Sequence, residues 1–274
     1  MDWRLIVPGA RELEHTDLRA AREVRLRPGQ PVWALLPEGV WQGSHVLTPE
    51  EVSRAAQALS GHGLAARRRE LAAGFLPLPE GSRLGVCGIM DENGLREITS
   101  LCVRQCHELP GVGAAVFPRV QGKNALILGP SGAGKTTLLR DLARLTARSG
   151  KQVGIIDERG ELAACRAGRP TLDVGPSCDV VTGMDRAKAV LLLIRAMAPQ
   201  VIVTDEMGGP ADARALAEAV RCGALVLASA HARCPEDLAA RPGMAGLLPL
   251  FDVFVILSAP GCPPRIREKG KEPE

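Results

Sequence analysis

One glycine-rich segment, GPSGAGKTT at residues 129–137, constrains the fold of this chain more than any other feature. It directly follows the apolar run NALIL and continues into KTTLLRDLARLTARSG, which has the apolar spacing of a helix that ends near Gly150. A strand, a glycine turn and a helix in this order match the phosphate-binding pattern G-x-x-x-x-G-K-[ST]. The segment therefore predicts a nucleotide-binding domain of the α/β class.

The pattern also assigns chemistry to the residues of this phosphate-binding loop. Its glycines let backbone N–H groups face the phosphates, Lys135 would reach the β- and γ-phosphates, and the Thr136 hydroxyl would bind Mg²⁺. ATP and Mg²⁺ are therefore the expected cofactors. The expected ATP-binding residues are Gly129, Pro130, Ser131, Gly132, Ala133, Gly134, Lys135, Thr136 and Thr137.

The segments that follow the loop alternate between strand and helix patterns. Short apolar runs such as KQVGIID, QVIVTDE, ALVLASAHA and FDVFVILSA are separated by helical stretches, including DRAKAVLLLIRAMAP and GPADARALAEAVRCG. Alternation of this kind predicts a mostly parallel sheet covered by helices. We expect the ATPase domain to span residues 121–259 and a proline-rich, charged tail at 260–274 to be disordered.

Residues 1–120 have a different pattern, typical of a small α+β domain. The segment TPEEVSRAAQALS carries a helix start, because Thr48 can cap it, Pro49 suits its first turn and Glu51 completes a capping box. The stretch from residue 74 to 106 has the pattern of two or three antiparallel strands, with turns at PEGS and DENG. The chain is therefore expected to hold two domains.

A second part of the nucleotide site is predicted in VIVTDE. Its apolar residues form a buried strand, and Asp205 at the end of that strand is placed to hold Mg²⁺ through water. Glu206 follows directly, where a carboxylate can orient or deprotonate an attacking water, which favours hydrolysis over phosphoryl transfer to a small acceptor. His231 at the end of ALVLASAHA and Glu158 in IIDERGE are expected at the same edge of the sheet.

Composition limits the classes of function that remain. The formal charge of +3 is too small to indicate nucleic acid as a default partner, and aromatic residues make up only 3% of the chain. No apolar run approaches the ~20 residues that span a bilayer, so we expect a cytoplasmic protein without direct membrane insertion. The eight cysteines contain no Cys-x-x-Cys pair and are expected to be mostly buried.

The order of five motifs resembles the stage III sporulation protein AA family: GPSGAGKTTLLRDLARL, GIIDERGELAAC, DVGPSCDVVTG, LLLIRAMAPQVIVTDEMG and ALVLASAHA. That family belongs with the ATPases of type II secretion, type IV pilus and related export systems. The likeness extends into the N-terminal domain through EVRLRPGQPV and GFLPLPEGSRLGVCG. It covers nearly everything from about residue 20 to 258.

The resemblance implies a RecA-like P-loop NTPase core and a homo-hexameric ring that powers or assembles an export-type channel during endospore formation. It implies that Asp157 and Glu158 of DERGE lie near Mg²⁺ or the attacking water, and that His231 senses the γ-phosphate. The implied partners are membrane proteins of the sporulation channel complex, which would hold the protein at the membrane. The arginines that could act on a neighbouring subunit's nucleotide are Arg25, Arg27, Arg83 and Arg104.

Two alternatives stay open from the sequence. A RecA-like ATPase that handles nucleic acid would need a basic track with stacking residues, for which the composition gives little material. A nucleotide-gated assembly scaffold would bind ATP with little turnover. Hydrolysis measured with and without single-stranded nucleic acid, and across assembly, separates these alternatives from an export ATPase.

Overall fold

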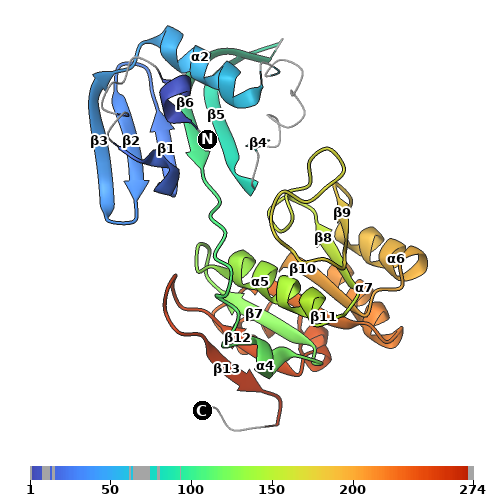
Figure 1. Ribbon diagram of the computed structural model, residues 1–274. Helices are drawn as coiled ribbons and strands as arrows, with labels where there is room; N and C mark the ends of the chain where they lie inside the picture. Colours follow the sequence, from blue (N-terminus) through green and yellow to red (C-terminus); the bar gives the residue numbers. More distant parts are fainter. Residues whose placement is uncertain are drawn as a thin grey trace. The chain divides into compact units, whose positions relative to one another are not determined.

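The computed structural model describes residues 2–7, 13, 16–61, 63, 75–78, 81–92 and 94–270. The chain divides into two compact units, Met1–His107 and Glu108–Glu274. Each unit has its own β-sheet and its own hydrophobic core (Figure 1). The two units are therefore described separately.

The first unit is built on a six-stranded antiparallel sheet with the strand order β3-β2-β1-β6-β5-β4. Every second residue of β1 and β2 is buried, so that Val24, Leu26, Val32 and Ala34 share the face that packs into the core. The strands are β1 (Glu23–Leu26), β2 (Pro31–Leu36), β3 (Gly39–Val46), β4 (Leu76–Pro77), β5 (Arg83–Asp91) and β6 (Gly94–Arg104).

Helix α2 (Pro49–Ser60) begins as the sequence predicts. The backbone N–H of Glu51 donates to the Thr48 hydroxyl over 3.2 Å, and the backbone N–H of Thr48 donates to the Glu51 carboxylate over 2.9 Å. This capping box is confirmed, and the helix ends before Gly61 in the left-handed conformation. The shorter helical elements of the unit are α1 (Trp3–Ile6) and η2 (Leu18–Ala20).

The second unit contains a seven-stranded sheet with the order β13-β12-β7-β11-β10-β8-β9. All neighbouring pairs are parallel except β12 with β13, which confirms the predicted mostly parallel sheet and the α/β class. The strands are β7 (Ala125–Gly129), β8 (Val153–Asp157), β9 (Cys178–Thr182), β10 (Val201–Met207), β11 (Leu225–His231), β12 (Val253–Ile256) and β13 (Arg265–Glu268).

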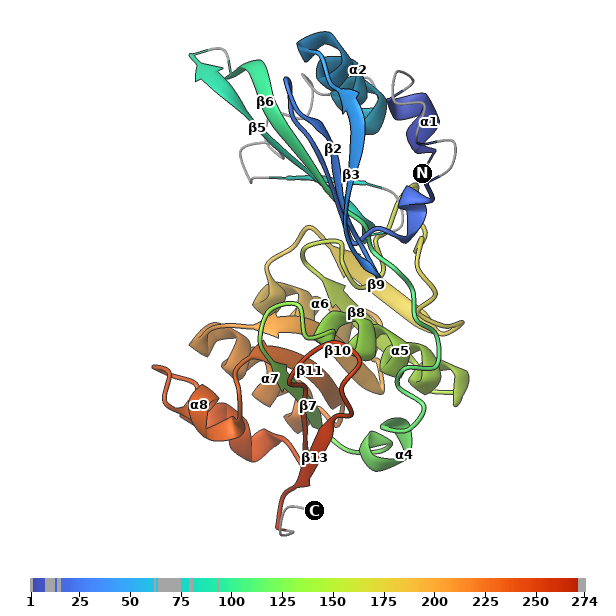
Figure 2. The same ribbon diagram turned by 90° about the vertical axis from the view of Figure 1, so that its left-hand side faces the viewer.

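Helices cover both faces of this sheet because successive residues of each buried strand point to opposite sides. Ile127 of β7 packs in one cluster with α5, whereas Leu126 and Leu128 pack in a second cluster with α6 and α7. Figure 2 shows α5 and α7 on opposite sides of β10 and β11. The helical elements are α4 (Phe117–Val120), α5 (Lys135–Arg148), α6 (Arg186–Ala196), α7 (Pro210–Arg221), α8 (Pro235–Ala239) and η5 (Ala245–Leu250).

The structure differs from the expected domain boundary at residue 120, because the second unit begins at Glu108. The backbone N–H groups of Gly111 and Gly113 donate to the buried carboxylate of Asp141 on α5, over 3.0 and 2.7 Å. Val116 and Val120 belong to the core cluster that contains α5. These contacts fix the segment before β7 to the second unit.

The expected disordered tail is also corrected, since Arg265–Glu268 forms strand β13 along the edge of the sheet. Its Glu268 carboxylate accepts from Arg119 over 2.9 Å and from Lys123 over 3.3 Å, which ties the strand to the segment before β7. The prediction that residues 260–274 are disordered is therefore wrong for Arg265–Glu268. The alternating charged residues of RIRE suit an exposed edge strand.

The cysteines are less buried than predicted. Cys87, Cys222 and Cys262 are exposed, and the other five are partly exposed.

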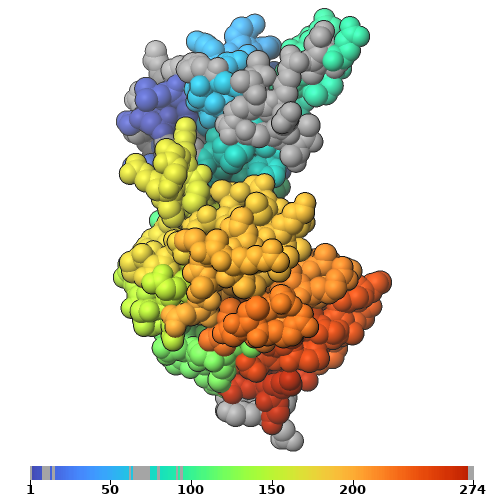
Figure 3. All heavy atoms as spheres, turned by 90° about the vertical axis from the view of Figure 1, so that its right-hand side faces the viewer, coloured from blue at the N-terminus to red at the C-terminus, as the bar shows by residue number. Residues whose placement is uncertain are grey.

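The space-filling view in Figure 3 shows the residues of α6 and α7 on the surface of the second unit, where Leu191, Leu192 and Met197 are 38–47% exposed. Among the helices of the described residues, none has both the length and the apolar character needed to cross a membrane.

Candidate functional site

The phosphate-binding loop joins the end of β7 to the start of α5, with β7 inside the sheet between β12 and β11. Gly132 and Gly134 have φ of 76° and 92°, the left-handed conformation that glycine adopts without steric cost. At Gly129 a side chain has no room, because its Cβ would lie 2.7 Å from the carbonyl oxygen of Leu257. The glycines of the motif are thus needed for its backbone shape.

The structure brings the two predicted metal ligands together. The hydroxyl of Thr136, at the start of α5, donates to Oδ2 of Asp205, near the end of β10, over 2.5 Å. The hydroxyl of Ser229 on β11 donates to the other oxygen, Oδ1. Three elements therefore fix one carboxylate at the carboxyl edge of the sheet, next to the phosphate-binding loop.

Glu206 has an unusual backbone conformation for a residue with a side chain. Its φ of 51° is left-handed, and the pairing of β10 with β11 shifts register between Thr204 and Met207. A conformation of this type costs of order 1–3 kcal/mol and is concentrated at functional sites. Its backbone N–H donates to Asp205 Oδ1 over 2.9 Å and to the Ser229 hydroxyl over 3.0 Å, which stabilises the bulge.

His231 lies between the lysine of the loop and Glu206. Lys135 Nζ is 3.1 Å from His231 Nδ1, and His231 Nε2 is 2.9 Å from Glu206 Oε1. An ammonium group can only donate, so Nδ1 accepts from Lys135 and the proton on Nε2 is donated to Glu206. The side chain of the buried Lys135 also donates to the carbonyl of Pro130 over 2.9 Å.

Burial and nearby charges change the pKa values of Lys135 and Glu206. Burial lowers the pKa of Lys135, although the negative charges of Asp205 and Glu206 oppose the shift. Burial alone would raise the pKa of Glu206, but the hydrogen bond from His231 and the positive charge of Arg159 outweigh it, so this pKa lies below its ordinary value. Glu206 is therefore a carboxylate at neutral pH.

Two residues of the cluster were not assigned from the sequence. Arg159 forms an ion pair with Glu206 Oε2, and Ser229 binds both Asp205 and the backbone of Glu206. Both residues lie inside motifs that the sequence singled out, DERGE and ALVLASAHA. The available signal was their position at the ends of parallel strands, which meet at one edge of the sheet.

Asp157 has a different environment from the one that the family resemblance implies. Its carboxylate is 2% exposed, and its two oxygens accept four backbone N–H groups of its own loop over 2.7–2.9 Å. The donors are the N–H groups of Glu161, Leu162, Ala163 and Ala164. Asp157 therefore stabilises the loop of residues 157–164, called the acidic loop below, and does not present free oxygens to a ligand.

Glu158 is directed to a second ion-pair network. Its carboxylate accepts from Arg186 at the start of α6 over 2.9 Å, and Arg186 also donates to Asp212 of α7 over 2.7 Å. Asp212 in turn accepts from the backbone N–H groups of Gly208 and Gly209, which follow β10. The structure thus joins Glu158 to α6 and α7 and does not bring it together with Glu206 among the described contacts.

The acidic loop is also attached to the helix that begins at the phosphate-binding loop. The buried Arg140 of α5 donates to the carbonyl oxygens of Leu162 over 2.7 Å and of Glu161 over 2.5 Å. Residues 161–164 are therefore held by Asp157 from one side and by α5 from the other. This arrangement fixes the backbone beside Arg159.

Three of the four candidate arginines of the first unit make described contacts on its sheet. Arg25 and Arg104 both form ion pairs with Glu23, the second over 3.4 Å, and the Arg25 guanidinium lies 6.0 Å from the ring centre of Trp33. Arg83 lies 4.6 Å from the ring centre of Phe75. Arg27 follows β1 and is partly exposed.

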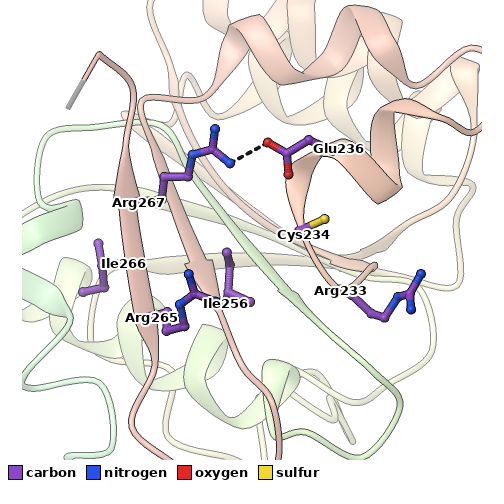
Figure 4. A pocket seen from close by; sticks show the side chains of 7 residues that line it. All are labelled: Arg233, Cys234, Glu236, Ile256, Arg265, Ile266 and Arg267. Carbon is purple, nitrogen blue, oxygen red and sulfur yellow. Dashed lines mark hydrogen bonds and ion pairs between the residues drawn. The ribbon is translucent and has the colours of Figure 1, made fainter. Parts of the chain in front are cut away.

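A surface pocket of about 210 Å³ lies between the start of α8 and strands β12 and β13 (Figure 4). Figure 4 shows the Arg267 guanidinium directed to Glu236, with which it forms an ion pair. Arg233 pairs with Asp237 over 3.4 Å. No residue of the phosphate-binding loop is among those that line this pocket in the described structure.

Comparisons with known sequences place these motifs in one family. A family model described as "Sporulation stage III, protein AA" matches residues 7–272. Stage III sporulation protein AA of Bacillus subtilis (strain 168) is 35% identical over 277 residues, which cover 94% of this chain and 87% of that protein. The uncharacterized protein ycf45 of Porphyra purpurea is 30% identical over 147 residues, covering 50% of this chain and 26% of that protein.

Two solved structures share the architecture. The ATPase DotB of Legionella pneumophila has a TM-score of 0.62 at 16% sequence identity, covering 91% of this chain and 75% of that one. The pilus retraction motor PilT, solved with bound ADP, has a TM-score of 0.58 at 16% identity, covering 94% of this chain and 78% of that one. These similarities confirm the expected α/β fold, which the chain shares with DotB and PilT.

Proposed function

The chain belongs to the sporulation stage III protein AA family, and on this premise we propose that it is a Mg²⁺-dependent ATPase that powers or assembles an export-type channel complex during endospore formation. The observation that carries the proposal is the run of contacts from Lys135 through His231 to Glu206, beside the Thr136–Asp205 pair. A phosphate-binding lysine, a metal-binding pair and a carboxylate base are the groups that ATP hydrolysis needs.

The residues present fit Mg²⁺, because this ion is commonly held by one or two protein oxygens together with phosphate oxygens and water. Thr136 and Asp205 would hold it, Asp205 through water. When bound, Mg²⁺ supplies positive charge to the β- and γ-phosphate oxygens. Lys135 would exchange the carbonyl of Pro130 for the same phosphates, and backbone N–H groups of residues 131–137 would donate to them.

Glu206 orients the attacking water and accepts its proton. His231 connects this base with the phosphate-binding residue, since Lys135 donates to Nδ1. When Lys135 turns to a phosphate, Nδ1 loses its donor while Nε2 still faces Glu206. His231 thereby senses the γ-phosphate, and Glu158 supports the site indirectly through Arg186 and α7.

We extend the proposal to the assembly: a homo-hexameric ring, cytoplasmic, bound at the membrane through membrane proteins of the sporulation channel complex and without a nucleic-acid partner. A trans-acting arginine from Arg25, Arg27, Arg83 or Arg104 would complete the site of a neighbouring subunit. Arg25 and Arg104 are held by Glu23, so their release would accompany such a role. Support comes from family membership and from the fold shared with the ATPase DotB and the pilus retraction motor PilT.

The test is hydrolysis by the wild type and by Glu206→Gln at protein concentrations that span assembly. We expect wild-type specific activity to rise with concentration, because sites completed between subunits need a partner, and the variant to be inactive throughout. Equal inactivity of both proteins in the assembled state would instead identify a nucleotide-gated scaffold. Strong, salt-sensitive stimulation by single-stranded DNA or RNA would identify a nucleic-acid ATPase.

A further inference from the structure

Arg159 contacts the residue that we assign as the base, yet it belongs to no part of the mechanism described so far. Its guanidinium pairs with Oε2 of Glu206, while His231 contacts Oε1. A guanidinium in contact with a carboxylate stabilises the charged form and so weakens it as a proton acceptor. The ion pair with Arg159 therefore makes Glu206 a weaker base for activating water.

The ion pair is built so that Arg159 can leave it. The Arg159 side chain is 54% exposed, whereas that of Glu206 is 20% exposed. A guanidinium carries five N–H donors, and within the described residues Glu206 is the one partner recorded for those of Arg159. Ion pairs whose arginine is open to solvent contribute little stability, so a phosphate can displace the carboxylate.

The backbone beside Arg159 is fixed, in contrast to its side chain. Asp157 accepts the four N–H groups of residues 161–164, and Arg140 binds the carbonyl groups of the same segment from α5. Gly160, with φ of 68°, makes the turn directly after Arg159. A long side chain on an anchored turn can exchange partners without movement of the loop.

A terminal phosphate is the anion that the site would bring to this position. Glu206 directly follows Asp205, which contacts Thr136 of the phosphate-binding loop over 2.5 Å. A phosphate bound by Lys135 would therefore lie close to the carboxylate that Arg159 holds. Planar guanidinium groups bind phosphate oxygens bidentately and more strongly than a single carboxylate contact.

We propose that Arg159 is a positioning residue that changes partner with the nucleotide: it holds Glu206 when the site is empty and binds the terminal phosphate of ATP when the site is filled. The exchange releases Glu206 for water only when a triphosphate is present. Arg159 then distinguishes ATP from ADP. The inference rests on the proposed ATPase function.

The experiment compares the affinities of ATPγS and ADP, measured by competition with a fluorescent nucleotide, for the wild type, Arg159→Ala and Arg159→Lys. We expect Arg159→Ala to bind ATPγS roughly 10–100-fold more weakly, the loss of a charge-assisted contact, and to bind ADP as the wild type does. Arg159→Lys should recover part of the ATPγS affinity. Arg166→Ala, an exposed arginine of the same segment, is the matched control and should change neither affinity.

The outcomes separate this inference from the function on which it rests. A loss of affinity for ATPγS and ADP alike would indicate a structural role and overturn the exchange. Tighter ATPγS binding with faster turnover in Arg159→Ala would indicate a restraint without a phosphate contact, which also overturns it. An unchanged ATPγS-to-ADP ratio in an active enzyme overturns the role of Arg159 alone, whereas a wild type that binds neither nucleotide overturns both proposals.

Discussion

Thr136 and Asp205 are 69 positions apart in sequence, and the hydroxyl of the first donates to the carboxylate of the second over 2.5 Å. The contact links the start of α5 to the end of β10, and it defines where a metal ion would be held. Ser229 binds the same carboxylate and fixes its orientation. Three elements of the second unit, α5, β10 and β11, therefore meet at this carboxylate.

Mg²⁺ is expected to increase the affinity for ATP. We predict that this increase is roughly 10–100-fold smaller in Thr136→Ala, because one direct oxygen ligand of the ion is lost. Thr136→Ser keeps the hydroxyl and is expected to keep the gain. Titration calorimetry with ATP, in the presence of Mg²⁺ and in the presence of a chelator, measures both. An equal gain in all three proteins would contradict the assigned metal position.

Glu206→Gln is predicted to lower the turnover of ATP by roughly 10²–10⁴-fold, the usual contribution of a general base. Its ATP affinity should be no weaker than that of the wild type, since the proposed phosphate contacts come from Lys135, the loop and Arg159 and none from Glu206. Glu158→Gln is the matched control, and because its ion pair with Arg186 is partly exposed, we expect a turnover within about threefold of the wild type. Equal losses in the two variants would remove the distinction between these carboxylates.

Asp157→Ala is predicted to destabilise the second unit by about 3 kcal/mol or more, because four backbone N–H groups lose their acceptor inside the protein. Urea denaturation followed by circular dichroism gives the free energy of unfolding. Asp179→Ala on the edge strand β9 is the control and should change this free energy by less than about 0.5 kcal/mol. If Asp157→Ala unfolded like the wild type but lost Mg²⁺ binding, the carboxylate would be a ligand and not a loop anchor.

The stability of the first unit should depend on pH through Glu51. The hydrogen bond from the backbone of Thr48, aided by His45, lowers the pKa of Glu51 against the effect of burial. The stabilisation is therefore complete above the ordinary pKa of a glutamate and is lost as the pH falls through the lowered value. In urea denaturation between pH 3 and 6, Glu51→Gln should flatten this acid limb, and the exposed Glu38→Gln should leave it unchanged.

The cysteines should differ widely in reactivity. Burial raises the pKa of Cys178 to about 12, and its thiol donates to the carbonyl of Val174 over 2.9 Å. At pH 8 its thiolate fraction is on the order of 10⁻⁴, so iodoacetamide should modify the exposed Cys87, Cys222 and Cys262 first. Mass spectrometry of timed samples measures the order, and early modification of Cys178 would contradict the raised pKa of its thiol.

The sequence was sufficient to predict the strand, turn and helix around residues 129–137, because the motif and its context specify a backbone shape. It also predicted that Asp205 and His231 lie near the loop, since parallel strands end at one edge of the sheet. In the structure, Asp205 accepts from the Thr136 hydroxyl and His231 Nδ1 accepts from Lys135. The sequence motif and the topology of a parallel sheet were enough for these predictions, because neither depends on the direction of a side chain.

Other features depend on side-chain direction, which the sequence does not specify. Asp157 and Glu158 are adjacent in DERGE, yet one carboxylate turns into its own loop and the other binds Arg186. The partnership of Arg159 with Glu206 likewise depends on a turn at Gly160.

The edge strand Arg265–Glu268 was missed because its four residues are mostly charged and follow a proline-rich segment.

The left-handed backbone at Glu206 sets which substitutions can accumulate there over evolutionary time. Glycine and asparagine adopt this conformation at lower cost than glutamate, so a descendant released from selection for turnover can gain stability by replacing it. Such a lineage would keep Asp157, which the fold itself requires. If the proposed function holds, glycine or asparagine at this position would mark relatives that retain the architecture without ATP hydrolysis.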